Sequence, residues 1–201
     1  DKSAPVRFTA LKMAEQHPAL VREVAALAKD TDPAVRLQLA LTLGEFNAPE
    51  AGAALGRIAA ASLGDVRMRL AVLSSATRSP AAVLGAVIAV DPKAAGRREM
   101  IDGLIRTAAA GDEKMREAVL DLVLPKENES FDAWRLEAAN TLIQSGAVSP
   151  RLARVREQAR AAASDEQRDL PSRQVALEIL GRSPLTAAEF ELFGNLLTQS
   201  P

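Results

Sequence analysis

Apolar residues recur every three to four positions along most of the 201-residue chain. In residues 33–46, for example, Val35, Leu39 and Leu43 follow this spacing, which places their side chains on one side of a helix. Prolines and glycines separate successive runs of this kind. Because proline fits the first turn of a helix and glycine commonly follows its end, the pattern predicts many short helices and indicates no strand.

The proline and glycine positions divide the chain into twelve predicted helices. Their spans are 4–16, 18–29, 33–46, 49–62, 65–77, 80–90, 92–109, 112–124, 130–145, 149–163, 170–181 and 186–199. The links between them are short, so successive helices are expected to run antiparallel. The longest polar interruption, PKENES at 125–130, reads either as a loop in one continuous stack or as a domain boundary. We favour the loop, and with it a single domain over 1–201, because the helical pattern resumes directly afterwards.

A second pattern repeats within these helices, an aspartate followed four residues later by an arginine. It occurs in DPAVR, DVRMR, DEKMR and DLPSR, which contain the pairs Asp32/Arg36, Asp65/Arg69, Asp112/Arg116 and Asp169/Arg173. In SAPVR, Ser3 stands in the aspartate position before Arg7, and in FDAWR, Asp132 precedes Arg135 by only three residues. The arginines are unevenly spaced, but the spacing is centred on the size of a helix-pair repeat.

Each of these aspartates is a candidate helix N-cap. Its carboxylate can accept a hydrogen bond from an unpaired backbone N–H of the first turn, and its charge suits the positive end of the helix. We expect each arginine to bridge to the capping aspartate of its own or the next repeat and so to fix the register between repeats. The other interpretation is a catalytic or anion-binding row. We favour the structural interpretation, because the positions repeat and active sites seldom do.

Composition narrows the classes of function. The formal net charge is −1, which argues against a dedicated nucleic-acid binder, because such a protein needs a clear excess of basic residues. The absence of cysteine excludes disulfides, thiolate metal sites and cysteine nucleophiles. No apolar run of about 18 residues or more is present, so direct membrane insertion is not expected.

Other candidate sites have simpler interpretations. His17 is the only histidine and precedes Pro18 at a predicted turn, so we expect it to be solvated rather than to bind a metal. GAALG, from Gly52 to Gly56, lies within a helical pattern and is expected to permit close helix packing rather than to cradle a phosphate. The acidic stretch KENES, 126–130, reads as a solvated loop rather than a metal site.

The most basic stretch is RLARVREQAR, residues 151–160. Its arginines fall on two edges of a helix instead of one stripe, and acidic residues follow closely. We therefore interpret it as a solvated face rather than as a nucleic-acid patch. A repeat-fold enzyme acting on nucleic acid remains only a remote alternative, because the chain has one tryptophan and no basic excess.

The few aromatic residues, 3% of the chain, supply the candidate partner contacts. Trp134 reads as a buried anchor of its repeat, with a partner hot spot as the alternative. The C-terminal stretch EFELFGNLLTQSP contains Phe190 and Phe193 and is apolar enough to form a closing helix or to contact a missing neighbour. Trp134, Phe190 and Phe193 are therefore the candidate residues for a partner contact, Trp134 only under the hot-spot alternative.

The repeated unit of cap, arginine, buried helix, turn and second helix resembles HEAT repeats, especially the short bacterial kind with an Asp-Pro-x-Val-Arg start. The match covers residues 1–77 well and the remainder more loosely. The resemblance implies an all-α HEAT-like α-α superhelix, or solenoid, of about six antiparallel helix pairs. Solenoids of this kind present an extended surface for a protein partner.

A closer resemblance rests on RLQLALTLGEF, MRLAVLSSA, WRLEAANTLIQSG and RQVALEILGRSP. These segments look like the helical HEAT region of large membrane-bound dehydrogenase-like, heme-binding proteins of planctomycetes and related bacteria. Such proteins carry a sugar-dehydrogenase-like β-propeller before the HEAT region and a cytochrome c module with Cys-x-x-Cys-His after it. This chain contains neither, so the resemblance assigns the redox activity of such a parent to no residue here.

The expected function is therefore non-catalytic: protein–protein interaction, or spacing between neighbouring domains of a longer chain. The segment itself indicates no location, whereas the resemblance implies an extracytoplasmic one, periplasmic or secreted. No catalytic residue, metal or cofactor is expected in this segment. The alternative is a stand-alone HEAT adaptor that binds a cellular protein. The start at DKSAPVRF, where a helix already begins, reads as a segment of something longer.

Overall fold

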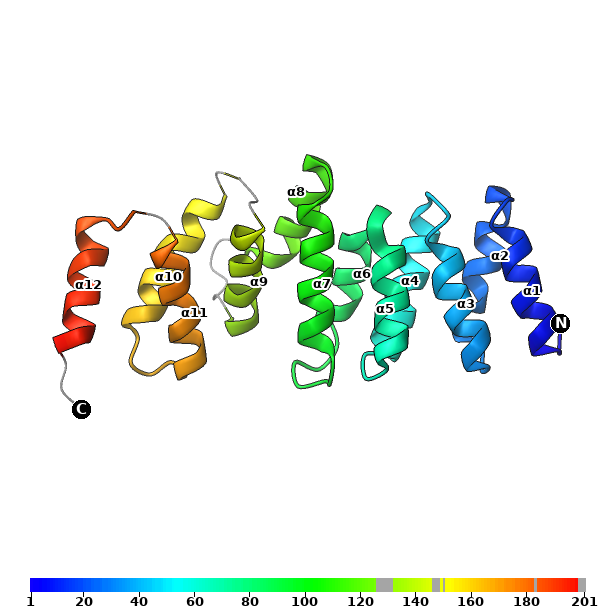
Figure 1. Ribbon diagram of the computed structural model, residues 1–201, viewed down its shortest axis with the longest axis horizontal. Coiled ribbons are helices and arrows are strands. Elements are labelled where there is room, and N and C mark those ends of the chain that lie inside the picture. The colour runs from blue at the N-terminus through cyan, green and yellow to red at the C-terminus, as the bar shows by residue number, and fades with distance from the viewer. Residues whose placement is uncertain (126–131, 146–148, 150, 183, 199–201) are drawn as a thin grey trace. The chain divides into compact units, whose positions relative to one another are not determined.

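The computed structural model describes residues 1–125, 132–145, 149, 151–182 and 184–198, and in that part of the chain it is helical with no strand (Figure 1). The predicted all-α class is therefore confirmed. The helices are α1 (Ala4–Ala14), α2 (Val21–Ala26), α3 (Pro33–Leu43), α4 (Pro49–Ala61), α5 (Val66–Ser75), α6 (Pro80–Ile88), α7 (Arg97–Ala109), α8 (Glu113–Val123), α9 (Ala133–Gln144), α10 (Leu152–Ser164), α11 (Leu170–Gly181) and α12 (Ala187–Thr198). Short 3-10 turns, Pro18–Leu20, Leu27–Lys29 and Ala76–Arg78, flank α2 and follow α5.

The chain divides into two compact units, Asp1–Leu122 and Val123–Pro201. The division falls just before residues 125–130, the stretch that the sequence allowed to be either a loop or a domain boundary. Most of that stretch, including Glu127 and Glu129, lies outside the described residues.

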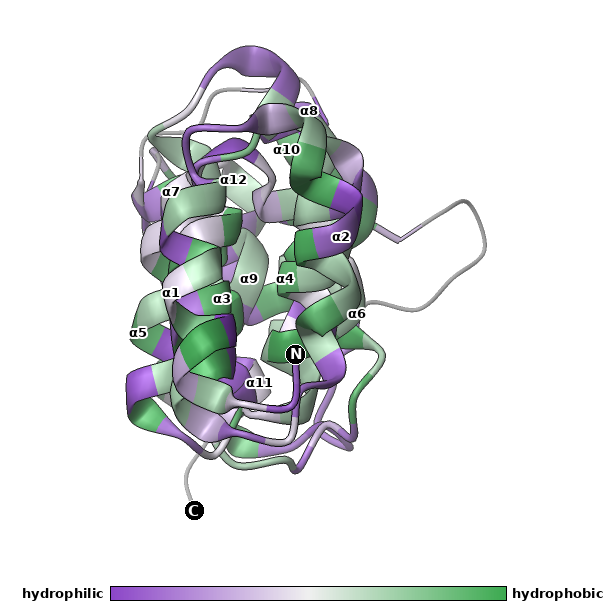
Figure 2. Ribbon diagram, turned by 90° about the vertical axis from the view of Figure 1, so that its right-hand side faces the viewer, coloured by the Kyte–Doolittle hydropathy of each residue, from purple (hydrophilic) through white to green (hydrophobic). Residues whose placement is uncertain are grey.

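The first unit is built in two layers of helices. In one layer α3 packs against α1 and α5, and in the other α4 packs against α2 and α6. Figure 2 shows the two layers side by side, with α1, α3 and α5 opposite α2, α4 and α6. Of the apolar positions predicted for 33–46, Val35, Leu39 and Leu43 are fully buried. Burial of such Leu and Ala faces supplies most of the stability of the layers.

Close contact between α4 and α6 depends on two glycines. A Cβ atom at Gly52 would lie 2.8 Å from Cβ of Ser79, and one at Gly56 would lie 2.9 Å from Cβ of Ala86. Both distances are shorter than a van der Waals contact, so only glycine lets the two helices approach this closely. The packing role predicted for GAALG is confirmed.

The predicted helix 92–109 is wrong in its first five residues. Asp91 accepts a hydrogen bond from the backbone N–H of Lys93 at 2.8 Å, which closes a turn where Pro92 suggested a helix start. Gly96 then adopts a left-handed backbone with φ of +79°, and α7 begins at Arg97. An added Cβ at Gly96 would also collide with the carbonyl oxygen of Leu63. Both the left-handed backbone and the lack of space therefore require glycine at this position.

The second unit contains α9 to α12. Here α11 packs against both α9 and α10. Leu136, Leu142 and Val155 are fully buried between these helices. The predicted spans 149–163, 170–181 and 186–199 agree with α10, α11 and α12 to within three residues at the described ends.

Candidate interaction surface

The four repeated aspartates lie where the sequence placed them, at helix N-termini. Asp32 accepts hydrogen bonds from the backbone N–H groups of Ala34 and Val35 at 2.9 and 3.0 Å. Asp65 does the same at the start of α5, Asp112 accepts from the N–H of Met115, and Asp169 accepts from the N–H of Ser172. Ser172 also donates its hydroxyl to Asp169, and these two hydrogen bonds lower the pKa of the Asp169 carboxyl. The predicted capping role is confirmed for all four.

The repeated arginines do not bridge to these caps, so that part of the prediction is wrong. Arg36 donates from Nη1 to the carbonyl oxygens of Asp30 and Thr31 at 2.8 and 3.0 Å. Arg69 donates to Leu63, Arg116 to Gly111 and Arg173 to Ala163, each to a backbone carbonyl upstream of its own helix. The reason is geometric: the cap carboxylate is engaged by the first turn, while carbonyls at the end of the preceding segment lack helical partners.

Arg135, in the sequence FDAWR, makes both kinds of contact: it donates to an upstream carbonyl like the four arginines above, and it also forms the predicted ion pair with the aspartate that precedes its own helix. Its Nη1 donates to the carbonyl oxygen of Val123 at 3.0 Å, and its Nε lies 3.9 Å from the Asp132 carboxylate. Each of these arginines therefore joins the start of one helix to the end of the segment before it.

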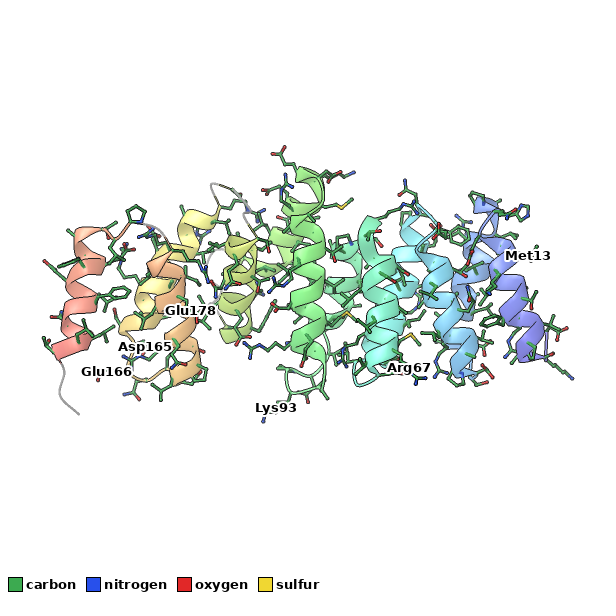
Figure 3. The ribbon with its side chains drawn as sticks, in the orientation of Figure 1. Met13, Arg67, Lys93, Asp165, Glu166 and Glu178 are labelled. Carbon is green, nitrogen blue, oxygen red and sulfur yellow. The ribbon has the colours of Figure 1, made fainter. Side chains whose placement is uncertain are left out.

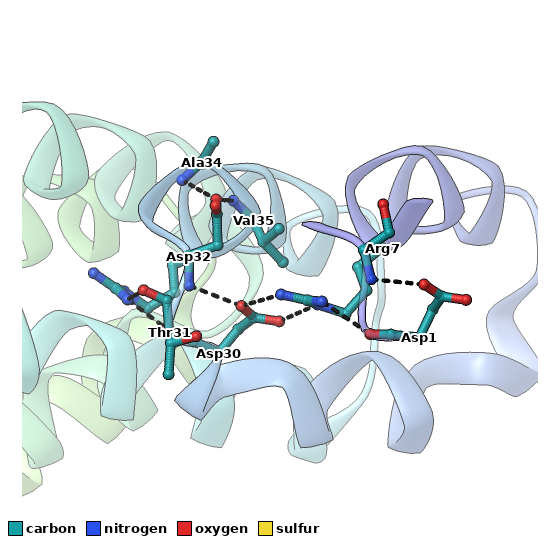
Figure 4. A network of polar contacts seen from close by, with 9 residues as sticks. Asp1, Arg7, Asp30, Thr31, Asp32, Ala34 and Val35 are labelled. Carbon is teal, nitrogen blue, oxygen red and sulfur yellow. Dashed lines mark hydrogen bonds and ion pairs between the residues drawn. The ribbon is translucent and has the colours of Figure 1, made fainter. Parts of the chain in front are cut away.

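Arg7 does make an ion pair with an acidic residue of the next repeat, although not with its cap. Its Nε and Nη2 bond the two carboxylate oxygens of Asp30 at 2.6 and 2.9 Å (Figure 4). Asp30 also accepts from the backbone N–H of Asp32 at 2.9 Å, so the pair is continuous with the cap of α3. The hydrogen bond from Arg7 holds the pKa of Asp30 below its usual range, against a smaller opposing effect of burial.

A polar cluster that the sequence did not reveal joins α1 to α3. The buried Thr42 donates its hydroxyl to the Glu15 carboxylate at 2.8 Å, and Gln38 donates to the same oxygen at 3.2 Å. Gln38 also donates to Thr42 at 3.1 Å. Since Gln38, Thr42 and Glu15 are all hydrogen-bonded to one another, the cluster fixes the register of the two helices.

The basic stretch 151–160 is only in part the predicted solvated face: Arg154 is exposed, but Arg156 and Arg160 hold α12. The Glu189 carboxylate is fully buried, and Nε of Arg156 donates to it at 2.6 Å and Nη2 of Arg160 at 3.2 Å. Thr186 and Glu189 form a capping box, since the Thr186 N–H donates to Glu189 at 2.8 Å and its hydroxyl accepts from the Glu189 N–H. The hydrogen bond from Arg156, with smaller contributions from Thr186 and Arg160, holds the pKa of Glu189 far below its usual range against the opposing effect of burial. The spacing Thr-x-x-Glu was the signal in the sequence.

The predicted aromatic contacts have different environments. Trp134 is half-buried, with the Arg135 guanidinium 5.0 Å from the centre of its ring, a cation–π arrangement. Phe193 is half-buried on α12, whereas Phe190 is 73% exposed. Of the three candidates, Phe190 is the one whose side chain is open to a partner.

Two shallow grooves mark the surface of the first unit. One lies between α2 and α4 and is lined by Ala25, Ala53, Arg57 and the ion pair of Arg22 and Glu50, whose Nε and Oε1 atoms are 3.2 Å apart. The other lies beside Phe8 and Val35, between α1 and α3.

His17 is exposed, as predicted. Within the described residues, no three of His, Cys, Asp and Glu gather into a group that could hold a metal ion. In the same part of the chain, none of the helices has the length and apolar character needed to cross a membrane. Comparison with protein-family models, with curated proteins and with solved structures found no match to this chain.

Proposed function

We propose that this chain is a non-catalytic HEAT-like repeat domain that holds a protein partner or spaces neighbouring domains. In this proposal its helices form an α-α superhelix of about six pairs. The chain belongs to a large extracytoplasmic, dehydrogenase-like protein whose cytochrome module binds heme elsewhere. The segment itself carries no cofactor and binds no nucleic acid.

The recurring arginine contact carries this proposal. In both units an arginine near the start of a helix donates to carbonyls at the end of the preceding segment, as Arg36 and Arg173 do. A contact that recurs along the chain favours a one-dimensional stack, in which each repeat touches only its neighbours and the surface extends with repeat number. Such a surface binds by shape and needs no reacting group.

One observation favours the second candidate, a stand-alone adaptor. Leu41 on α3 and Val66 and Leu70 on α5 are exposed aliphatic residues on neighbouring helices of one layer. Apolar side chains clustered on adjacent helices are typical of a surface that receives a partner. Substituting Leu70 with Asp would abolish binding of a partner on this face while leaving a pure spacer unaffected.

The superhelix is tested by small-angle X-ray scattering of the 201-residue chain. A compact domain of this length has a radius of gyration of about 16–17 Å, and a continuous superhelix predicts a clearly larger value with one fixed distance distribution. A value near 16–17 Å would contradict the superhelix.

The non-catalytic role is tested by adding hemin, and separately sugars with an artificial electron acceptor, to the isolated chain. We expect neither a stoichiometric shift of the hemin absorption band nor turnover, with an unrelated helical protein as the control for adventitious hemin binding. Stoichiometric heme binding or turnover by the chain would overturn the proposal.

A further inference from the structure

The groove between α2 and α4 has an excess of positive charge. Arg22 and Glu50 line it as an ion pair. Arg57 lines it as well, is exposed, and has no hydrogen-bond or ion-pair partner among the described residues. The charge that the groove offers to a partner is therefore the guanidinium of Arg57, although the whole chain has a net charge of −1.

Small side chains line the rest of this groove. They are Ala25, Ala26 and Ala53, of which Ala26 and Ala53 are exposed. An alanine side chain ends at Cβ, so a larger aliphatic side chain from outside can enter between the two helices, as ridges enter grooves when helices pack. The groove has a volume of about 390 Å³ and is open on its outer side, so it suits the side chains of a partner better than an enclosed small molecule.

The arrangement of the two helices favours a helix as the occupant. Arg22 and Glu50 are the second residues of α2 and α4, and their contact shows that the two helices begin side by side. The helices also pack against each other in one layer, so the groove runs along both (Figure 2). Arg57 follows Ala53 by four residues, which is about one turn of α4. A helix lying in the groove can therefore place an aliphatic side chain on the alanines and, one turn away, a carboxylate on Arg57.

Charge selects an acidic helix over a basic one. A carboxylate near Arg57 would pair with a guanidinium that lacks a partner in the described part of the chain, whereas a lysine or arginine there would bring like charges together. At the start of the groove Glu50 already pairs with Arg22, so the carboxylate of the partner is expected at the Arg57 end.

We propose that the groove between α2 and α4 binds an acidic amphipathic helix of a protein partner. The helix packs an aliphatic side chain on Ala26 and Ala53 and pairs a carboxylate with Arg57. This inference rests on the proposed function, because it names the kind of partner that the repeat domain holds and the surface that holds it.

The test is a fluorescence-anisotropy titration of two labelled peptides of about 15 residues with the 201-residue chain. Both peptides have leucine at helical spacing, and the remaining positions are glutamate in one and lysine in the other. Arg57→Glu reverses the charge of the groove, and Ala53→Leu fills it. Their controls are Arg67→Glu, an exposed arginine at the start of α5 (Figure 3), and Ala61→Leu, an exposed alanine of α4 that does not line the groove. Circular dichroism of each variant confirms that its helix content is unchanged.

The chain should bind the glutamate peptide saturably, with a Kd below about 1 mM, and the lysine peptide at least about tenfold more weakly. Arg57→Glu and Ala53→Leu should each weaken binding of the glutamate peptide by about tenfold or more. Arg67→Glu and Ala61→Leu should change it by about twofold or less, because exposed charges beyond a Debye length are screened at physiological salt.

Three results would overturn the proposal: no saturable binding of the glutamate peptide, equal binding of the two peptides, or an equal loss for Arg57→Glu and Arg67→Glu. Any of these would remove this site alone, because a spacer needs no groove. Heme binding or turnover by the chain would instead remove the proposed function, so the two failures are distinguishable.

Discussion

Replacing Asp32 and Arg36, singly and together, tests whether the repeated pair acts as two separate devices. Asp32 accepts two backbone hydrogen bonds at 2.9 and 3.0 Å, so Asp32→Ala should cost about 1 kcal/mol of unfolding free energy. Arg36 donates two hydrogen bonds to carbonyls from a half-buried side chain, so Arg36→Met should cost about 1–2 kcal/mol. Because the two side chains share no hydrogen bond, the double variant should lose about the sum, with a coupling energy below about 0.5 kcal/mol.

The assay is urea unfolding at pH 7 followed by far-UV circular dichroism, with coupling computed only where the denaturant slopes agree. The matched control is the cycle of Arg7→Met and Asp30→Asn. That pair is bidentate and partly buried, so its coupling should be at least about 1 kcal/mol. A coupling above about 1 kcal/mol for Asp32 and Arg36 would refute the separation of cap and arginine contact.

Two further predictions concern packing and acid stability. Gly56→Ala places a Cβ against Ala86, and this overpacking should cost about 1–3 kcal/mol of unfolding free energy, more than the gain in helix propensity. The control is Gly64→Ala, because nothing lies within 4 Å of the Cβ that it adds. Equal melting temperatures for the two variants would contradict the packing argument. Glu189 has a folded pKa below its ordinary value of 4.5, so its contribution to stability is present above that pH and is lost as the pH falls below it. Glu189→Gln should therefore flatten the fall in melting temperature between about pH 5 and pH 3, and an unchanged acid limb would show that the carboxylate is not paired in solution.

Helix positions were predictable because their signals are local. Pro33, Pro49 and Pro80 open α3, α4 and α6, where a missing N–H costs nothing and the fixed φ is already helical. The same signal failed at Pro92, because the Asp91 turn and the left-handed Gly96 delay the helix by five residues. Proline marks a favourable start, but it does not distinguish a helix from a turn that precedes one.

The partners of the charged residues were less predictable. An N-cap hydrogen bond joins one side chain to backbone N–H groups two or three residues later, so the capping role of Asp32 could be predicted from the sequence. The arginine contacts depend on where the end of the preceding segment comes to lie. Glu189 meets Arg156 across 33 residues, and sequence spacing carries no information about such a distance. The capping box of Thr186 and Glu189 has a local signal, the Thr-x-x-Glu spacing, which the predicted helix starts did not use.

The sequence of the gene on both sides of these 201 codons tests the central claim most directly. If the chain is a helical spacer or docking domain of an extracytoplasmic redox protein, a β-propeller-like region should precede it and a Cys-x-x-Cys-His module should follow it. Flanks with neither feature, or start and stop codons directly beside the segment, would contradict that origin and leave the adaptor as the function to test.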